Sequence, residues 1–213
     1  GVEEDKNGAA YFLKTAAQMG HVDAMFQYGV MLDDGDGILK NKPKALEYYK
    51  LAAQEGNDHA MFMCGTMLSF GKGVTQDCTE GLKYLKMAIE KGNVDAMYLL
   101  GMIFHAAENE KEAVIYFKMA AEKGHVNSCF HYAEDLYNGN GIQKDKKEAA
   151  KFYLVAVNGG HPEAMLKYSY MLKKGDNVTK DKKEAQRLRD LAIKADPTLV
   201  EKEKNMSVCC NIF

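Results

Sequence analysis

Residues 20–56 read GHVDAMFQYGVMLDDGDGILKNKPKALEYYKLAAQEG, and most of the chain consists of further copies of this stretch. The glycine that closes each copy recurs in steps of 36, 36, 32 and 36 residues, at Gly20, Gly56, Gly92, Gly124 and Gly160. A series of Asp and Asn residues repeats with the same short third step, at Asp5, Asn41, Asp77, Asn109, Asp145 and Asp181. Self-similarity at this period predicts a stacked array of helical hairpins.

The two series predict where helices begin and end. Each Asp or Asn precedes a run of helix formers, and four of them have a glutamate three positions later, the spacing of a capping box: Glu80, Glu112, Glu148 and Glu184. Each closing glycine suits the left-handed conformation that follows a helix, and acidic residues such as Asp23 and Asp95 stand at the next helix start. Each copy is therefore expected to contain two helices.

Small and bulky residues alternate inside each copy. The first helix carries small residues at two registers five positions apart, which are Ala24, Ala60, Ala96, Ser128 and Ala164, and Gly29, Gly65, Gly101, Ala133 and Ser169. The second helix carries an aromatic residue at Tyr48, Tyr84, Tyr116 and Phe152, flanked by rows of small residues. Methionines repeat as well, as at Met31, Met67 and Met171, and their spacing favours a place in the core. Such rows predict closely packed helices.

These motifs, A-x-x-x-[LYC]-G, G-x-G-[IV], D-x-x-x-A and A-A-x-x-G, resemble the Sel-one-like repeat family, whose members are related to tetratricopeptide repeats. The resemblance covers roughly residues 1–196. It implies an all-α fold, a right-handed α-solenoid of antiparallel helix pairs that serves as an adaptor between other proteins. The copy at residues 94–124 lacks the G-x-G loop, and Ala133 and Ser169 replace the family glycine, departures that concern only local helix packing.

The expected organisation is a repeat array followed by a tail. A half repeat at 1–20 precedes five full repeats, at residues 22–56, 58–92, 94–124, 126–160 and 162–195. Residues 197–213 are expected to form a polar capping helix and a C-terminal tail. Because the half repeat lacks a first helix, Phe12 and Leu13 are expected to lack the helix that would cover them. We therefore expect the chain to be the C-terminal part of a longer protein.

Composition argues against several classes of protein. The net charge of −2 and pI of about 6.3 provide no basic surface for nucleic acid. No apolar run is long enough to span a membrane. The five cysteines, Cys64, Cys78, Cys129, Cys209 and Cys210, are irregularly placed, which favours a reducing compartment, the cytoplasm. Glycosylation-type triplets at Asn177 and Asn205 leave the lumen of the endoplasmic reticulum as a less favoured alternative.

The sequence predicts no catalytic residue, cofactor or metal site. Its six histidines include no H-x-x-x-H pair, and His21, His125 and His161 directly follow closing glycines, so that they belong to the repeat. No nucleophile, base and orienting group occur together in a recognised motif. We therefore expect a protein without enzymatic activity.

The candidate binding surface is a stripe along the first helices, which family geometry places on the concave side. It runs through positions that the repeat pattern constrains least. The predicted partner-binding residues are Gln27, Met63, Leu99, Met102, His131, Glu134, Lys167 and Tyr170. Solvent-facing Met63, Leu99 and Met102 would form an apolar patch, which on a soluble protein usually marks a partner site.

The last four residues, Cys210 to Phe213, fit the C-a-a-X pattern of prenylation, with Cys209 available for a second lipid. Such a modification would associate the chain reversibly with membranes. Two functions remain open. One is a non-enzymatic scaffold that binds polypeptide segments, and the other is the C-terminal regulatory or targeting region of a larger signalling enzyme, such as a protein kinase.

Overall fold

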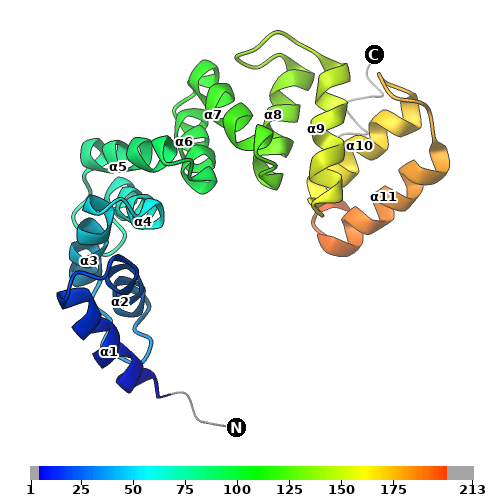
Figure 1. The fold of residues 1–213 in the computed structure, drawn as a ribbon. Helices are drawn as coiled ribbons and strands as arrows, with labels where there is room; N and C mark the ends of the chain where they lie inside the picture. Colours follow the sequence, from blue (N-terminus) through cyan, green and yellow to red (C-terminus); the bar gives the residue numbers. More distant parts are fainter. Residues whose placement is uncertain (1–4, 201–213) are drawn as a thin grey trace. The chain divides into compact units, whose positions relative to one another are not determined.

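The computed structural model describes residues 5–200, and within this range the fold is all-α, with eleven helices and no strand (Figure 1). In chain order the helices are α1 (Lys6–Gln18), α2 (Val22–Asp34), α3 (Lys42–Gln54), α4 (Asp58–Phe70), α5 (Cys78–Glu90), α6 (Val94–Ala106), α7 (Glu110–Glu122), α8 (Val126–Asn138), α9 (Lys146–Asn158), α10 (Pro162–Lys174) and α11 (Lys182–Ala195). The even-numbered helices open the repeats and the odd-numbered helices from α3 onward close them. The predicted solenoid of helix pairs is confirmed.

The Asp and Asn series caps the second helices as predicted. The side chains of all six residues accept a hydrogen bond from the backbone N–H three positions later, which satisfies one of the unpaired donors at a helix start. First helices use other caps: Asn57 and Asn93 accept from Ala60 and Ala96 at 2.8 and 2.9 Å, while His125 and His161 accept through Nδ1 at 3.2 Å. These two histidines are therefore structural.

The closing glycines adopt the conformation that the sequence predicts. Their φ angles lie between +82° and +92°, a region that favours glycine because it has no Cβ. A second set of left-handed glycines stands in the G-x-G turns between paired helices. The last such turn has Asn177 at φ +59° where Gly141 stands one repeat earlier. Asn tolerates this conformation better than most residues.

The described chain divides into two compact units, one ending at Met97 and one beginning at Tyr98. Each helix within a unit contacts the next along the chain. The contacting pairs are α1–α2, α2–α3, α3–α4 and α4–α5 in the first unit, and α7–α8, α8–α9, α9–α10 and α10–α11 in the second.

The first unit contains a very close approach of two helices. Gly65 on α4 and Gly81 on α5 face each other, so that a Cβ on Gly81 would lie 3.0 Å from the carbonyl oxygen of Gly65. The absence of both side chains lets Met61, Cys64 and Leu85 close over the junction, each at most 3% exposed. Burial raises the pKa of the Cys64 thiol to about 12, so this thiol is a core group.

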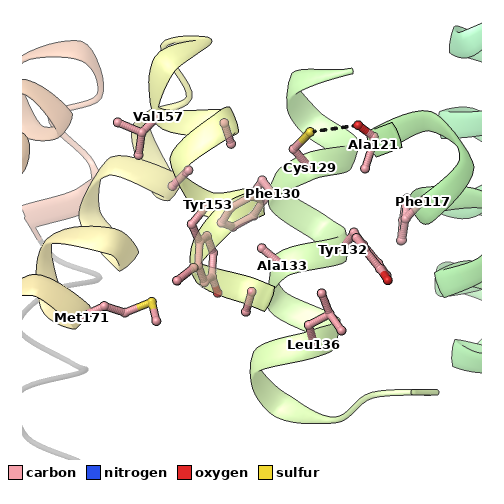
Figure 2. Close-up of a cluster of buried hydrophobic side chains, with 14 of the residues drawn as sticks. Phe117, Ala121, Cys129, Phe130, Tyr132, Ala133, Leu136, Tyr153, Val157 and Met171 are labelled. Carbon is pink, nitrogen blue, oxygen red and sulfur yellow. Dashed lines mark hydrogen bonds between the residues drawn. The ribbon is translucent and has the colours of Figure 1, made fainter. Parts of the chain in front are cut away.

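The core of the second unit is built from aromatic and small residues on α7 to α11 (Figure 2). Phe117, Tyr132 and Tyr153 are at most 4% exposed, and the Ala133 between them is fully buried. The Cys129 thiol donates to the carbonyl oxygen of Ala121 at 3.5 Å. Ala133 and Ser169, which replace the family glycine, are both buried, at 0% and 3% exposed.

The two ends of the array differ from its interior. On α1, Phe12 is 72% exposed, whereas the equivalent Tyr48 packs edge-on against Tyr28 at 4.8 Å. After α11, the carboxylate of Asp196 accepts from the backbone N–H and hydroxyl of Thr198, and Leu199 is fully buried. Residues 197–198 form a turn there. The rest of the predicted capping helix lies outside the described residues.

Candidate functional surface

The predicted stripe is divided between the two units. Gln27, on α2, is exposed, and Met63, on α4, is half-buried, both within the first unit. The other six residues belong to the second unit, two on each of α6, α8 and α10. They are Leu99, Met102, His131, Glu134, Lys167 and Tyr170, and all are half-buried. We call these six residues the second-unit stripe.

His131 occupies the centre of the second-unit stripe and is held by aromatic rings. Its imidazole stacks on Phe117 with 4.8 Å between centroids and 14° between planes, and Tyr98 and His105 lie 6.0 and 6.3 Å away. Burial lowers the pKa of His131 to about 4, and the neighbouring histidines act in the same direction. His131 is therefore neutral at physiological pH and presents a ring nitrogen for hydrogen bonding.

Glu134 joins three helices at the next turn of α8. Lys167 on α10 donates to its Oε2 at 2.9 Å, and the hydroxyl of Tyr153 on α9 donates to its Oε1. Burial is the main cause that raises the pKa of Tyr153, and the negative charge of Glu134 raises it further. The Tyr153 hydroxyl therefore keeps its proton. The contact between Glu134 and Lys167 brings stripe residues of consecutive repeats together.

The apolar members of the stripe are less exposed than the sequence suggested. Met102 packs against the core of the second unit, and Tyr170 packs against Leu166, Ala192 and Leu199. The most exposed large apolar side chains lie elsewhere, namely Tyr11, Phe12, Met19, Leu39, Leu51, Phe70, Ile115, Leu154, Val155 and Leu191. Half-burial of Met102 and Tyr170 results from their packing against these core residues.

A pocket of about 430 Å³ adjoins Tyr170 between α10 and α11, and the sequence analysis did not identify it. Its charged and polar lining consists of Ser169, Lys173, Lys182, Gln186 and Arg189. Arg189 stands at the register of the buried Tyr49, Leu85, Phe117 and Tyr153. This replacement of a buried apolar residue by arginine could have predicted from the sequence that α11 presents a polar face at the end of the repeats.

Among residues 5–200, no group of three or more His, Cys, Asp or Glu side chains is placed to hold a metal ion. None of the helices in that range is long and apolar enough to cross a membrane. Within the same range Cys64 and Cys129 are buried and Cys78 is exposed, all three as free thiols. The lipidation candidates Cys209 and Cys210 lie outside the described residues.

Comparison with solved structures places this fold among known repeat proteins. The structure of c5321, described as a protective antigen of uropathogenic Escherichia coli strains with an SLR fold, matches 90% of the chain at 24% identity and a TM-score of 0.86. The chain spans 42% of the length of that structure. A Sel1 repeat protein from Oxalobacter formigenes matches with 27% identity and a TM-score of 0.74, over 90% of this chain and 78% of that one.

A more distant likeness extends to tetratricopeptide repeats. YrrB, described as a TPR protein with an unusual peptide-binding site, has a TM-score of 0.55 at 18% identity over 91% of this chain and 97% of its own. Among curated protein sequences there is no match. The family model of the Sel1 repeat matches six consecutive segments, at residues 1–21, 22–57, 58–93, 94–125, 126–161 and 162–196. The chain therefore belongs to the Sel1 repeat family.

Proposed function

We propose that the protein is a non-enzymatic scaffold that binds a polypeptide segment on the second-unit stripe. The observation that carries this proposal is the Glu134 carboxylate, which Lys167 and Tyr153 hold from two other helices while it remains partly open to solvent. Polar groups whose orientation is fixed before binding lose little entropy when a partner arrives. Glu134 would accept hydrogen bonds from the partner's backbone or side chains.

Apolar contacts on either side of this carboxylate favour a polypeptide as the ligand. Leu99 and Met102 stand on α6, one repeat before Glu134, and Tyr170 stands on α10, one repeat after it. A polypeptide segment presents alternating polar backbone groups and apolar side chains that suit such a surface. A flexible methionine adapts to partners of different shape. The near-neutral net charge does not suit nucleic acid.

In the first unit, Gln27 and Met63 stand at the register that Leu99 holds in the second unit. We propose that these two residues also contact a partner. YrrB is described as having a peptide-binding site on a related helical repeat. This supports the proposal only through the shared fold. A folded array of this kind supplies binding groups without any covalent chemistry of its own. The scaffold therefore needs no catalytic residue.

Selection from a peptide library, followed by affinity measurement, tests the proposal. Truncation of an interface anchor typically costs about 1–3 kcal/mol, so Leu99→Ala is expected to weaken binding of a selected peptide roughly 5- to 150-fold. Lys167→Ala should weaken it less, because partly exposed charges contribute less than apolar anchors. Ile115→Ala on α7, where the side chain is 49% exposed, is the matched control and should leave affinity unchanged.

Melting temperatures separate binding from packing. Lost affinity with an unchanged melting temperature supports the proposed surface. If Leu99→Ala instead lowers the melting temperature while the folded fraction binds normally, Leu99 belongs to the core and the proposal loses its main apolar contact.

A further inference from the structure

One residue of α8 breaks the register of the repeat. Asp135 stands where the other first helices have Met31, Met67, Ile103 and Met171. The residue is only 4% exposed, close to the 1% and 3% of Met67 and Met171. An acidic side chain therefore occupies a position that the fold otherwise fills with a large apolar one. Burial of a carboxylate at such a position is costly unless it is paired.

The surroundings of Asp135 do not provide that pairing. Its Oδ2 atom is buried and has no hydrogen-bond partner among the described residues. The Asn140 side chain, in the turn after α8, donates a hydrogen bond to its carboxyl group. Two further carboxylates lie near it, Glu110 from the start of α7 and Glu134 from α8 itself.

The remaining titratable neighbours of Asp135 provide little or no positive charge to balance its carboxylate. His105 at the end of α6 is the positive influence on the Asp135 carboxyl, but His105 already pairs with Glu110 at 3.1 Å. The charge of Asp135 also acts on Tyr132, on α8, and on Tyr153, on α9. Burial raises the pKa of both hydroxyls, so both stay neutral and neither balances the charge of the carboxylate. The charged groups that act most strongly on the carboxyl of Asp135 are Glu110, His105 and Glu134.

We propose that Asp135 is a proton-dependent switch of the repeat formed by α8 and α9, which holds the α8 part of the second-unit stripe in place when protonated and loosens it when ionised. The inference rests on the proposed function, because it concerns the same surface. Glu134 directly precedes Asp135, and His131 lies one helical turn before it on the same face of α8. A movement of α8 that brings Asp135 toward water would therefore displace both stripe residues.

The direction of the effect follows from burial. Burial, reinforced by Glu110, raises the pKa of Asp135 from 3.8 to about 7, so the folded protein keeps a proton that the unfolded chain releases. The stability of the repeat is therefore expected to fall as pH rises from about 4 to about 7. Above pH 7 the Asp135 carboxyl is ionised in both the folded and the unfolded chain, so its contribution to stability no longer changes with pH.

His131 opposes this trend in an overlapping range. Burial lowers its pKa from 6.5 to about 4, so the unfolded chain binds the proton more readily, and stability is expected to rise with pH across that interval. The two effects partly cancel in the native protein. Only a comparison between variants at matched pH isolates the contribution of Asp135.

The decisive comparison uses Asp135→Met, which restores the residue of the register, and Asp135→Asn, which keeps the shape of the side chain without its charge. The unfolding equilibrium of each chain is measured in denaturant at pH 5.5 and pH 8. Because the wild-type pKa values of about 7 folded and 3.8 unfolded determine the linkage, the ratio of variant to wild-type folding constants is expected to rise about 30-fold between the two pH values. Both variants share the His131 contribution, which cancels.

Hydrogen exchange locates the response. In the wild-type chain the amides of α8 should lose protection relative to α10 between pH 5.5 and pH 8 after correction for intrinsic exchange, and in Asp135→Met they should not. A ratio of folding constants that stays the same at both pH values for both variants would overturn the proposal, and so would equal loss of protection in α8 and α10. The test needs no ligand, so it remains decisive if library peptides fail to bind and the proposed function is lost.

Discussion

Replacing Gly81 by alanine is expected to lower the melting temperature, although the same exchange inside a helix usually stabilises by about 1 kcal/mol. The new Cβ would lie 2.3 Å from Oγ of Ser69, 2.7 Å from the backbone nitrogen of Ser69 and 3.0 Å from the carbonyl oxygen of Gly65. Two of these atoms belong to the backbone of α4 and cannot rotate away. Overpacking of this kind typically costs about 1–3 kcal/mol or more, so we expect a net loss of about 2 kcal/mol.

Thermal unfolding of three chains tests this expectation. A loss of about 2 kcal/mol corresponds to a melting temperature lower by roughly 4–8 °C for a chain of this size. The double variant Ser69→Ala with Gly81→Ala removes the clash with Oγ but not those with the backbone, and should recover little of the loss. An increase in melting temperature for Gly81→Ala alone would show that α4 and α5 do not approach so closely.

Phe117→Ala is expected to destabilise the protein more than any other single change considered, by about 3–5 kcal/mol. The ring is 1% exposed, and Gly101 leaves room for it, since a Cβ there would lie 2.7 Å from the ring. The same ring forms the stacking partner of His131. Its removal should therefore also expose His131 and return the pKa of that imidazole from about 4 toward its ordinary value.

Denaturant unfolding and an NMR titration of the His131 ring measure the two consequences of Phe117→Ala. The matched control is Phe12→Ala on α1, where the ring is 72% exposed and the change should stay within about 0.5 kcal/mol. Equal losses for the two substitutions would contradict the assignment of Phe117 to the core. An unchanged His131 titration in a folded Phe117→Ala chain would contradict the role given to stacking.

Local chemistry made the helix boundaries predictable. A left-handed glycine after a helix and an Asp or Asn before one each satisfy a requirement of the backbone itself, so Gly56 and Asp77 reveal their roles without knowledge of any neighbour. The caps of the first helices were less visible. Asn57 and His125 stand directly after a closing glycine, and the sequence analysis assigned His125 only to the repeat pattern. The hydrogen bonds of the structure show that both side chains cap a helix.

The arrangement of the candidate surface depends on contacts that no single repeat contains. The contact of Glu134 with Lys167 joins side chains 33 residues apart, and its second partner, Tyr153, lies on a different helix. Periodicity placed Glu134 and Lys167 in one stripe but could not show that they neutralise each other. Half-burial of Met102 likewise results from packing by adjacent repeats.

Asp135 was the clearest signal that the sequence analysis did not use. The register of Met31, Met67 and Met171 had been identified, and its continuation into the fourth full repeat leads to an aspartate. A break in an otherwise apolar register can be found by alignment of the repeats alone. Its consequence, a buried carboxylate beside Glu110 and Glu134, required the structure.

Photo-cross-linking of a library-selected peptide tests most directly whether a polypeptide segment lies along the second-unit stripe. A peptide that carries a photoreactive group at each position in turn is bound to the intact chain, and the cross-linked residues are identified by mass spectrometry. We expect adducts on α6, α8 and α10 at or beside Leu99, His131 and Tyr170. Adducts confined to the exposed apolar residues of the second helices, such as Ile115 and Leu154, would contradict it.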